Sequence, residues 1–414
     1  MGLAVLRTLV RSWLVVAALC LIGPATTQAA APPLKGVAVD VLYGESDADT
    51  QLQLDRARSL GSNVVRLSVN WSGLEPFRKG EYAQWYLDRL DRAVDGAARR
   101  GMGVVMTPVS TPCWASSAPA SMRRQCAGAD WDTGAVQWAP SRASDYGDLV
   151  GMLVRRYTTR LTALEVWNEP NLPEFLRNPR PAQVYVGLLR AASAASRKAD
   201  RRVQVLAGAL SGSDTAFLGE MYAAGAKGLY DGLSVHPYNG DRAPEVLLEA
   251  RWIAASFVQG VPAVRRLALS RRDSSPLWVT EFGYNTSTTR GVDQWSDGIS
   301  PDDQAAWLSR SVAMLGALPY VRTATIYHLR DRGSNPAAAQ DNFGLLTRSY
   351  APKPAYAAVR AAFAGSRTPV AARTRAARAR AARARAARDR ASRRQKVAAV
   401  AGSVGSTQRS WVDG

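Results

Sequence analysis

Two glutamates occupy positions from which the chain could carry out acid–base and nucleophilic chemistry. Glu169 lies in the run Glu165-Val166-Trp167-Asn168-Glu169-Pro170, directly after a short apolar stretch. Glu281 closes another apolar stretch, Leu277-Trp278-Val279-Thr280-Glu281. Two carboxyl groups that flank one bond can divide the work, because one attacks a carbon while the other gives a proton to the departing oxygen. Cleavage of a glycosidic bond requires such a pair.

Short apolar runs alternate with longer amphipathic segments between residues 33 and 366. The apolar runs predict eight strands: Gly36–Val41, Asn63–Val69, Gly103–Pro108, Leu161–Trp167, Val203–Ala209, Leu233–His236, Leu277–Glu281 and Thr323–Tyr327. The intervening segments predict helices such as Asp47–Leu60, Tyr82–Arg100, Ser141–Arg160, Pro181–Ala199 and Pro301–Leu315. Eight such strands with helices between them predict an α/β protein, a single (β/α)8 TIM barrel. Runs rich in Val, Ile and Leu suit parallel strands buried on both faces. A doubly wound sheet has the same periodicity and is the alternative.

The order of the strands would bring the two glutamates together. Glu169 follows the fourth predicted strand and Glu281 closes the seventh. In a TIM barrel, residues at the C-terminal ends of the strands face the active site. The fourth and seventh strands lie on opposite sides of the barrel mouth, so their carboxylates could flank one bond. Hydrolysis with retention of configuration requires carboxyl groups roughly 5–5.5 Å apart.

Two short motifs resemble those of a known group of enzymes. Trp167-Asn168-Glu169-Pro170 and Thr280-Glu281-Phe282-Gly283 resemble the acid/base and nucleophile motifs of glycoside hydrolase clan A, the TIM-barrel retaining glycosidases. Within that clan the chain is most similar to families 39 and 5, which include β-xylosidases and cellulases, over nearly all of residues 34–366. The resemblance implies a retaining hydrolase of β-linked glycans without a cofactor, in which Glu281 is the nucleophile and Glu169 the general acid/base.

Other positions match the clan residue by residue. Arg66, on the second predicted strand, resembles the arginine that hydrogen-bonds the nucleophile and keeps it ionised. Asn168 resembles the residue that holds the sugar 2-hydroxyl. His236-Pro237-Tyr238 looks like the His/Tyr pair beside the nucleophile, where the Tyr238 hydroxyl orients the carboxylate. The alternatives are a purely salt-bridging Arg66 and a purely structural His236.

Aromatic side chains could line the sugar subsites, because sugar faces pack on rings as apolar groups do. Trp71 follows the second predicted strand and Trp114 the third, although core packing would explain both equally well. Related chains carry a tryptophan on the eighth strand beneath the reacting sugar, and Ile326 stands where we align it. Tyr327 could fill part of that role. His328 is expected either to line the substrate site or to be structural.

The N-terminal residues predict secretion. Residues 1–30 contain two arginines near their start, Arg7 and Arg11, then an apolar stretch, and finally small residues. This is the layout of a signal peptide. A retained membrane anchor is the alternative; after cleavage we expect no transmembrane anchor. Cys113 and Cys126 would then remain, and in an oxidising compartment they could form one disulfide, although two free thiols are the alternative. Few and widely spaced His and Cys residues predict no metal site.

The C-terminal segment, residues 367–414, is rich in Arg and Ala. Between Arg367 and Lys396 it contains eleven arginines, one lysine and one aspartate. This stretch therefore contributes +11 to the chain's net charge of +19. A five-residue repeat would place arginine on every side of a helix, so the segment has no apolar face and predicts a disordered tail. We expect the protein to be secreted, either extracellular or associated with the cell wall. The expected partner of the tail is then an anionic envelope polymer rather than a specific nucleic acid. The alternative is a solvated tail without a dedicated partner.

The sequence therefore predicts a signal peptide over residues 1–30, a hydrolase barrel over residues 31–366 and a basic tail over residues 367–414. A second class of protein fits part of the pattern, namely a non-catalytic glycan-binding protein on a degenerate hydrolase barrel. The presence of both glutamates argues against that class, and Ile326 argues slightly for it. The sugar, its linkage, internal or terminal cleavage, and the oligomeric state stay open.

Overall fold

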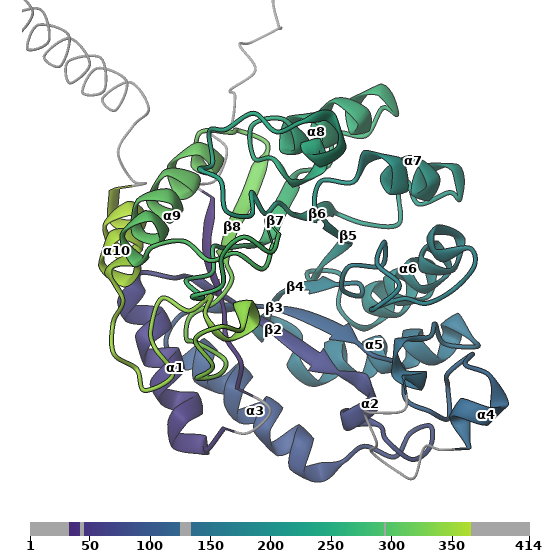
Figure 1. Cartoon of the computed structure of the whole chain (residues 1–414). Coiled ribbons are helices and arrows are strands. Elements are labelled where there is room, and N and C mark those ends of the chain that lie inside the picture. The colour runs from purple at the N-terminus through teal and green to yellow at the C-terminus, as the bar shows by residue number, and fades with distance from the viewer. Residues whose placement is uncertain (1–32, 42–44, 125–133, 294, 366–414) are drawn as a thin grey trace, which may run out of the picture. The chain divides into compact units, whose positions relative to one another are not determined.

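Eight parallel strands form a closed barrel surrounded by helices (Figure 1). The computed structural model describes residues 33–41, 45–124, 134–293 and 295–365. The strands are β1 (Leu34–Ala38), β2 (Val64–Asn70), β3 (Gly103–Val109), β4 (Leu161–Glu165), β5 (Gln204–Ser211), β6 (Gly232–His236), β7 (Leu277–Phe282) and β8 (Val321–Ile326). Each strand pairs with the next, and β8 pairs with β1 to close the sheet. The predicted TIM barrel is confirmed, and the doubly wound alternative is wrong.

Helices follow the strands along the chain. They are α1 (Asp47–Leu60), α2 (Trp71–Leu74), α3 (Gln84–Arg99), α4 (Ala120–Arg123), α5 (Ala143–Tyr157), α6 (Pro181–Ala199), α7 (Thr215–Ala223), α8 (Gly260–Ser270), α9 (Pro301–Gly316) and α10 (Pro354–Gly365). Short 3-10 turns are η2 (Ala135–Gln137), η3 (Thr158–Arg160), η4 (Ala250–Ala255) and η5 (Ala339–Asp341). The bounds predicted for α1 and α6 agree to the residue, because local signals mark these ends.

Those local signals are caps. The Ser46 side chain accepts the Asp49 backbone N–H, and the Asp49 carboxylate accepts the Ser46 N–H, which is a capping box at the start of α1. The helix ends at Gly61, whose φ of 95° is the left-handed conformation that glycine adopts without cost. Pro181 occupies the first turn of α6, where its missing N–H is not needed.

The barrel interior is built in layers. Val64, Val105, Ala163, Leu206 and Trp278 form a separate buried apolar cluster, one residue from each of five strands. Side chains alternate between the two faces of a strand, so the residue two positions further on also points inward. In four of these strands that residue is polar and buried: Arg66, Thr107, Glu165 and Thr280. An apolar floor thus supports a polar layer directly beneath the C-terminal mouth of the barrel.

An irregularity in β5 connects the barrel to that mouth. The register of β5 against β6 shifts between Ala207 and Leu210, and Gly208 lies in this bulge with a φ of 110°. Its N–H donates to the Tyr185 hydroxyl at 2.7 Å. The carbonyl oxygen of the next residue, Ala209, accepts a hydrogen bond from the backbone N–H of Glu169 at 2.9 Å. The bulge therefore helps to place the segment that carries Glu169.

Some predictions fall outside the described residues. They are the signal peptide at residues 1–30, the tail at residues 367–414 and Cys126. Cys113 is half-buried, and its pairing with Cys126 stays a prediction. Within the described part of the chain, no helix combines the length and the apolar character needed to cross a membrane.

Replacement of Gly208 by alanine tests the bulge. A Cβ atom there would lie 2.5 Å from the Ser234 carbonyl oxygen, and a non-glycine residue at this φ is itself strained. We expect Gly208→Ala to lower the free energy of unfolding by about 1–3 kcal/mol or more, as measured by urea denaturation. The control is Gly219→Ala in α7, where a Cβ meets nothing within 4 Å. That change should raise stability by about 0.5–1 kcal/mol. Equal stability of the two variants would contradict the role given to the bulge.

Candidate active site

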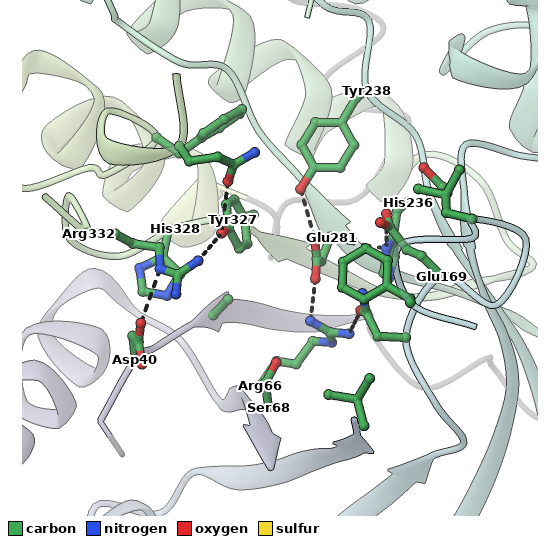
Figure 2. A pocket seen from close by; sticks show the side chains of 18 of the residues that line it. Asp40, Arg66, Ser68, Glu169, His236, Tyr238, Glu281, Tyr327, His328 and Arg332 are labelled. Atoms are coloured by element: carbon green, nitrogen blue, oxygen red, sulfur yellow. Dashed lines mark hydrogen bonds and ion pairs between the residues drawn. The ribbon is translucent and has the colours of Figure 1, made fainter. Parts of the chain in front are cut away.

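A cavity of about 810 Å³ lies at the C-terminal ends of the strands (Figure 2). Seven of the side chains that we expected in the active site line it: Arg66, Asn168, Glu169, His236, Tyr238, Glu281 and Tyr327. These residues come from β2, from the segment after β4, from β6 and the loop after it, from β7, and from the position directly after β8. The barrel therefore assembles into one cavity residues that are far apart in the sequence.

Arg66 is the centre of the polar layer. Its side chain is 2% exposed, and its guanidinium contacts three partners. Nη1 donates to the Glu281 carboxylate, Nη2 donates to Asn168 Oδ1 at 2.8 Å, and Nε donates to Glu165 Oε2 at 2.8 Å. Two buried carboxylates raise the pKa of Arg66 above its ordinary value despite burial. The arginine is charged at every relevant pH.

Both oxygens of the Glu281 carboxylate accept hydrogen bonds. Oε1 accepts from Arg66, and Oε2 accepts from the Tyr238 hydroxyl at 2.8 Å. Burial alone would raise the pKa of Glu281, but the charges of His236 and Arg66 and the Tyr238 hydrogen bond lower it below the ordinary value. Burial and the nearby carboxylates raise the pKa of Tyr238 well above its ordinary value, so its hydroxyl keeps its proton and donates. Glu281 is consequently ionised.

Glu169 faces Glu281 across the cavity and is bound by His236. His236 Nδ1 lies 3.0 Å from Glu169 Oε1 and 3.9 Å from Glu281 Oε2. The other ring nitrogen lies 3.1 Å from the Thr280 hydroxyl, which fixes the ring. Burial disfavours the charged imidazole, but Glu281 and Glu169 outweigh it and raise the pKa of His236. His236 thus links the two carboxylates.

Glu169, His236 and Glu281 form a compact group. One carboxylate oxygen from each glutamate and one nitrogen of His236 all lie within 4.8 Å of one another. Such a set of ligand atoms could also hold a metal ion, since imidazole and carboxylate are common ligands. The same closeness would allow the two carboxyl groups to flank one substrate atom.

The backbone around Glu169 is strained. Trp167 has a φ of 67° and Glu169 a φ of 43°, both in the left-handed region that residues with a side chain avoid. Such conformations cost about 1–3 kcal/mol each and persist only where neighbours hold them. Here the Trp167 N–H donates to the Tyr146 hydroxyl at 3.0 Å, and the Glu169 N–H donates to the Ala209 carbonyl. The strain turns Asn168 and Glu169 toward the cavity.

Glu165 belongs to the site, although the sequence did not predict it there. This carboxylate is fully buried and accepts hydrogen bonds from Arg66 and from the Thr107 hydroxyl, both at 2.8 Å. Burial would raise its pKa, but the charges of Arg66 and His236 lower it. The signal that could have found it is its place in an apolar strand, since an isolated acid there requires a buried cation.

Two expected aromatic residues lie elsewhere. Trp71 and Trp114 are absent from the described residues that line the cavity. Trp71 is fully buried, Trp114 is half-buried, and their rings pack edge to face with centroids 5.8 Å apart. Their indole N–H groups donate to the Glu75 side chain and carbonyl at 2.6 and 2.8 Å. Both residues therefore pack around Glu75, where neither contacts the cavity that we expected them to line.

The end of β8 presents a tyrosine to the cavity. Ile326 is fully buried in the strand, whereas Tyr327 lines the cavity and packs against Phe343 with ring centroids 5.4 Å apart. His328 also lines the cavity, and burial lowers its pKa to about 4, so it is neutral at pH 7. Asp40 and Arg332, which the sequence analysis did not single out, complete this wall.

The chain matches a family of known enzymes. The family model described as glycosyl hydrolases family 39 matches residues 133–364, which is more than half of the chain. A probable glucan 1,3-beta-glucosidase A from Aspergillus niger is 28% identical over 149 residues. The match covers 34% of this chain and 32% of that relative, so the chain spans about a third of the relative's length. These similarities define the chain as a glycoside hydrolase.

Solved structures of other proteins share this fold. A family 39 glycoside hydrolase from the gut symbiont Bacteroides cellulosilyticus has a TM-score of 0.61 at 20% identity, with 80% of this chain and 63% of that chain covered. GH5_18 from Streptomyces cattleya has a TM-score of 0.59 at 18% identity, with 82% of each chain covered. The expected relationship to clan A is confirmed. The protein belongs to glycosyl hydrolases family 39.

The lowered pKa of Glu165 makes its contribution to stability depend on pH. A carboxyl group whose pKa is lower in the folded state stabilises the fold above its ordinary pKa of about 4.3, and this stabilisation is lost as the pH falls through the folded value. We expect Glu165→Gln to reduce the free energy of unfolding by about 3–5 kcal/mol at pH 7, because it removes one partner of a buried ion pair. The difference from the wild type should shrink below about pH 4.3.

Urea denaturation between pH 7 and pH 3 measures this dependence. The control is Glu245→Gln, because Glu245 pairs with Arg310 on the surface, where both side chains are more than 40% exposed. An exposed pair contributes little, so this control should differ from the wild type by less than about 1 kcal/mol at every pH. A difference for Glu165→Gln that stays constant from pH 7 to pH 3 would show that its ionisation is not what stabilises the fold.

Proposed function

We propose that the protein hydrolyses β-linked glycans with retention of configuration, with Glu281 as nucleophile and Glu169 as general acid/base. The observation that carries the proposal is the distance between the two carboxylates, which bring one oxygen each to within 4.8 Å. Retaining enzymes hold their carboxyl groups roughly 5–5.5 Å apart, whereas inverting enzymes leave roughly 6.5–9.5 Å for a water molecule. The spacing supports direct attack by Glu281.

In the first step, an ionised Glu281 oxygen attacks the anomeric carbon while the glycosidic bond breaks. Glu169 gives its proton to the departing oxygen, and a covalent ester joins the sugar to Glu281. The Arg66 and Tyr238 hydrogen bonds support this role, because they hold the attacking carboxylate in one orientation and keep it charged. As the ester forms, the negative charge on Glu281 disappears and these two hydrogen bonds weaken.

In the second step, Glu169 takes a proton from a water molecule. The oxygen of that water attacks the anomeric carbon, and the bond to Glu281 breaks with return of its negative charge. His236 supports this cycle, because its Nδ1 lies 3.0 Å from Glu169 Oε1 and keeps that carboxyl group beside the substrate. The balance of the reaction is one water consumed for each glycosidic bond cleaved.

Asn168 and Tyr327 would bind the sugar. Arg66 donates to Asn168 Oδ1 and thereby orients the amide, which leaves its NH2 group to donate to the sugar 2-hydroxyl. Tyr327 offers a ring on the cavity wall, with Phe343 packed against it and Trp295 elsewhere in the lining. We propose that Tyr327 takes the place of the tryptophan that we aligned with Ile326. The alternative of a glycan-binding protein without activity is not favoured, since both glutamates have the contacts that catalysis needs.

Replacement of either glutamate tests the proposal. We expect Glu169→Ala to lower kcat/KM on an aryl β-glycoside with a poor leaving group, such as phenol, by about 10²–10⁴-fold, which is the usual contribution of general acid–base catalysis. Glu281→Ala should lose at least as much, because no covalent intermediate can form. Steady-state release of the aryl group measures both variants, and NMR of the first-formed sugar measures retention.

The matched control is Glu174→Gln, because Glu174 is exposed in the same loop as Glu169. Its kcat/KM should stay within about twofold of the wild type, as for most surface changes. Substantial turnover of the phenyl β-glycoside by Glu281→Ala or Glu169→Ala would remove the residue from its proposed role. Inversion at the anomeric carbon would rule out double displacement.

We also propose that the protein is secreted and that its basic tail binds an anionic polymer of the cell envelope. The support is the sequence: a signal-like segment at residues 1–30 and a charge of +11 between Arg367 and Lys396. We expect the full chain to sediment with isolated cell walls, and a chain that ends at residue 366 to stay in solution. Binding should weaken as salt screens the charges, by a large factor between about 50 mM and 500 mM salt. Equal sedimentation of both chains would contradict the role of the tail.

A further inference from the structure

The cavity has a second polar group that the proposed mechanism does not use. Asp40, which follows β1, and Arg332, which follows β8, lie on the side of Glu281 opposite Glu169 (Figure 2). Arg332 Nε donates to Asp40 Oδ2 at 3.1 Å, and Nη1 donates to the Tyr327 hydroxyl at 3.3 Å. The Tyr327 hydroxyl in turn donates to Gln340 Oε1 at 3.4 Å. These four side chains form one polar wall.

This wall presents unused hydrogen-bonding groups. Asp40 Oδ1 and Arg332 Nη2 have no hydrogen-bond partner among the described residues. The side chains of Asp40 and Arg332 are 35% and 48% exposed, and both line the cavity, so a ligand in the cavity can contact them. An ion pair with this much exposure contributes little to stability, because water screens it. Stability of the fold therefore does not account for a charged pair at this place.

Its position identifies the part of the substrate that would meet it. Under the proposed function, Glu169 protonates the departing oxygen, so the leaving group extends toward Glu169. The sugar ring that Glu281 attacks, the glycon, is bonded to the same anomeric carbon and must occupy the rest of the cavity, which Asp40 and Arg332 line on the side of Glu281 opposite Glu169 (Figure 2). With the anomeric carbon beside Glu281, the far end of the ring would reach the polar wall.

We propose that Asp40 and Arg332 bind two neighbouring hydroxyl groups at the far end of the glycon and thereby select a neutral sugar. The inference rests on the proposed function and adds the class of glycon to it. Each hydroxyl can donate and accept, so one hydroxyl donates to Asp40 Oδ1 while its neighbour accepts from Arg332 Nη2. Hydrogen bonds to charged groups are the strong ones, and they discriminate against a sugar that lacks the hydroxyl.

The same pair disfavours charged sugars. The carboxylate of a uronic acid would be attracted by Arg332 but would meet the like charge of Asp40, which is paired with that arginine. The ammonium group of an amino sugar would meet Arg332. His328 adds no charge at neutral pH, because burial holds its pKa at about 4. The wall is neutral in sum and suits a ligand that is neutral and rich in hydroxyls.

The experiment uses the full chain and a panel of aryl β-glycosides with neutral, uronic and amino sugars. For the best substrate, analogues that each lack one hydroxyl at the far end of the ring are compared. The variants are Asp40→Asn, which keeps the shape and removes the charge, and Arg332→Gln. The control is Asp200→Asn, because the pair of Asp200 with Arg202 lies before β5, at the opposite end of the barrel.

We expect the wild type to prefer a neutral sugar and to lose about 10–100-fold in kcat/KM when the bound hydroxyl is missing. Asp40→Asn and Arg332→Gln should lose a similar factor on the complete sugar, but discriminate less than threefold against the analogue. The discrimination is the ratio of kcat/KM on the complete sugar to kcat/KM on the analogue. Within one variant, this ratio does not depend on how much of the protein is folded. Asp200→Asn should keep the selectivity of the wild type.

Other outcomes overturn the inference in distinguishable ways. If the wild type prefers a uronic acid, or if both variants keep the full discrimination against every analogue, the wall does not select the glycon although the hydrolase proposal stands. If no glycoside is hydrolysed by the wild type, and Glu281→Ala is indistinguishable from it, the proposed function fails and this inference fails with it.

Discussion

The site depends on one buried cation that two carboxylates share. Arg66 is 2% exposed and donates to both Glu165 and Glu281. Removal of a guanidinium and two carboxylates from water is costly, and only close charge pairing with nearly full hydrogen bonding offsets that cost. Thr107 and Tyr238 supply further hydrogen bonds to the two acids. The arrangement leaves little freedom for Glu281, so the requirement for charge compensation also fixes its orientation, which supports the proposed nucleophilic role.

Glu169 is positioned by a different means. Its backbone, like that of Trp167, lies in a conformation that costs free energy, and hydrogen bonds to Ala209 and Tyr146 hold the segment in place. The bulge at Gly208 makes the first of these bonds available. Rigid strands thus carry the strained turn, and the two carboxylates approach within 4.8 Å from opposite sides of the barrel. Charge pairing places one glutamate, and backbone geometry places the other.

Under the proposed roles, the reacting groups and the groups that recognise the sugar occupy different parts of the cavity. Glu169, His236 and Glu281 occupy one part, while Asp40, Arg332 and Tyr327 form the wall beyond Glu281 (Figure 2). TIM barrels support this division, because the strand ends carry the reacting groups and the loops that follow can vary independently. Membership of the family therefore concerns the reaction, whereas the proposed choice of sugar depends on residues of the loops after β1 and β8.

The sequence by itself determined the eight strands, because apolar runs bounded by turns report burial directly. It also placed Glu169 and Glu281 at strand ends and Arg66 on the second strand. Strand periodicity says which face a side chain takes, but not which distant residue it meets. Only the tertiary structure decided that Glu165 shares Arg66, and that Trp71 and Trp114 pack around Glu75. It also decided that Asp40 pairs with Arg332, a residue 292 positions away. These outcomes depend on how the barrel closes and how its loops pack. Neither barrel closure nor loop packing produces a periodic pattern in the sequence.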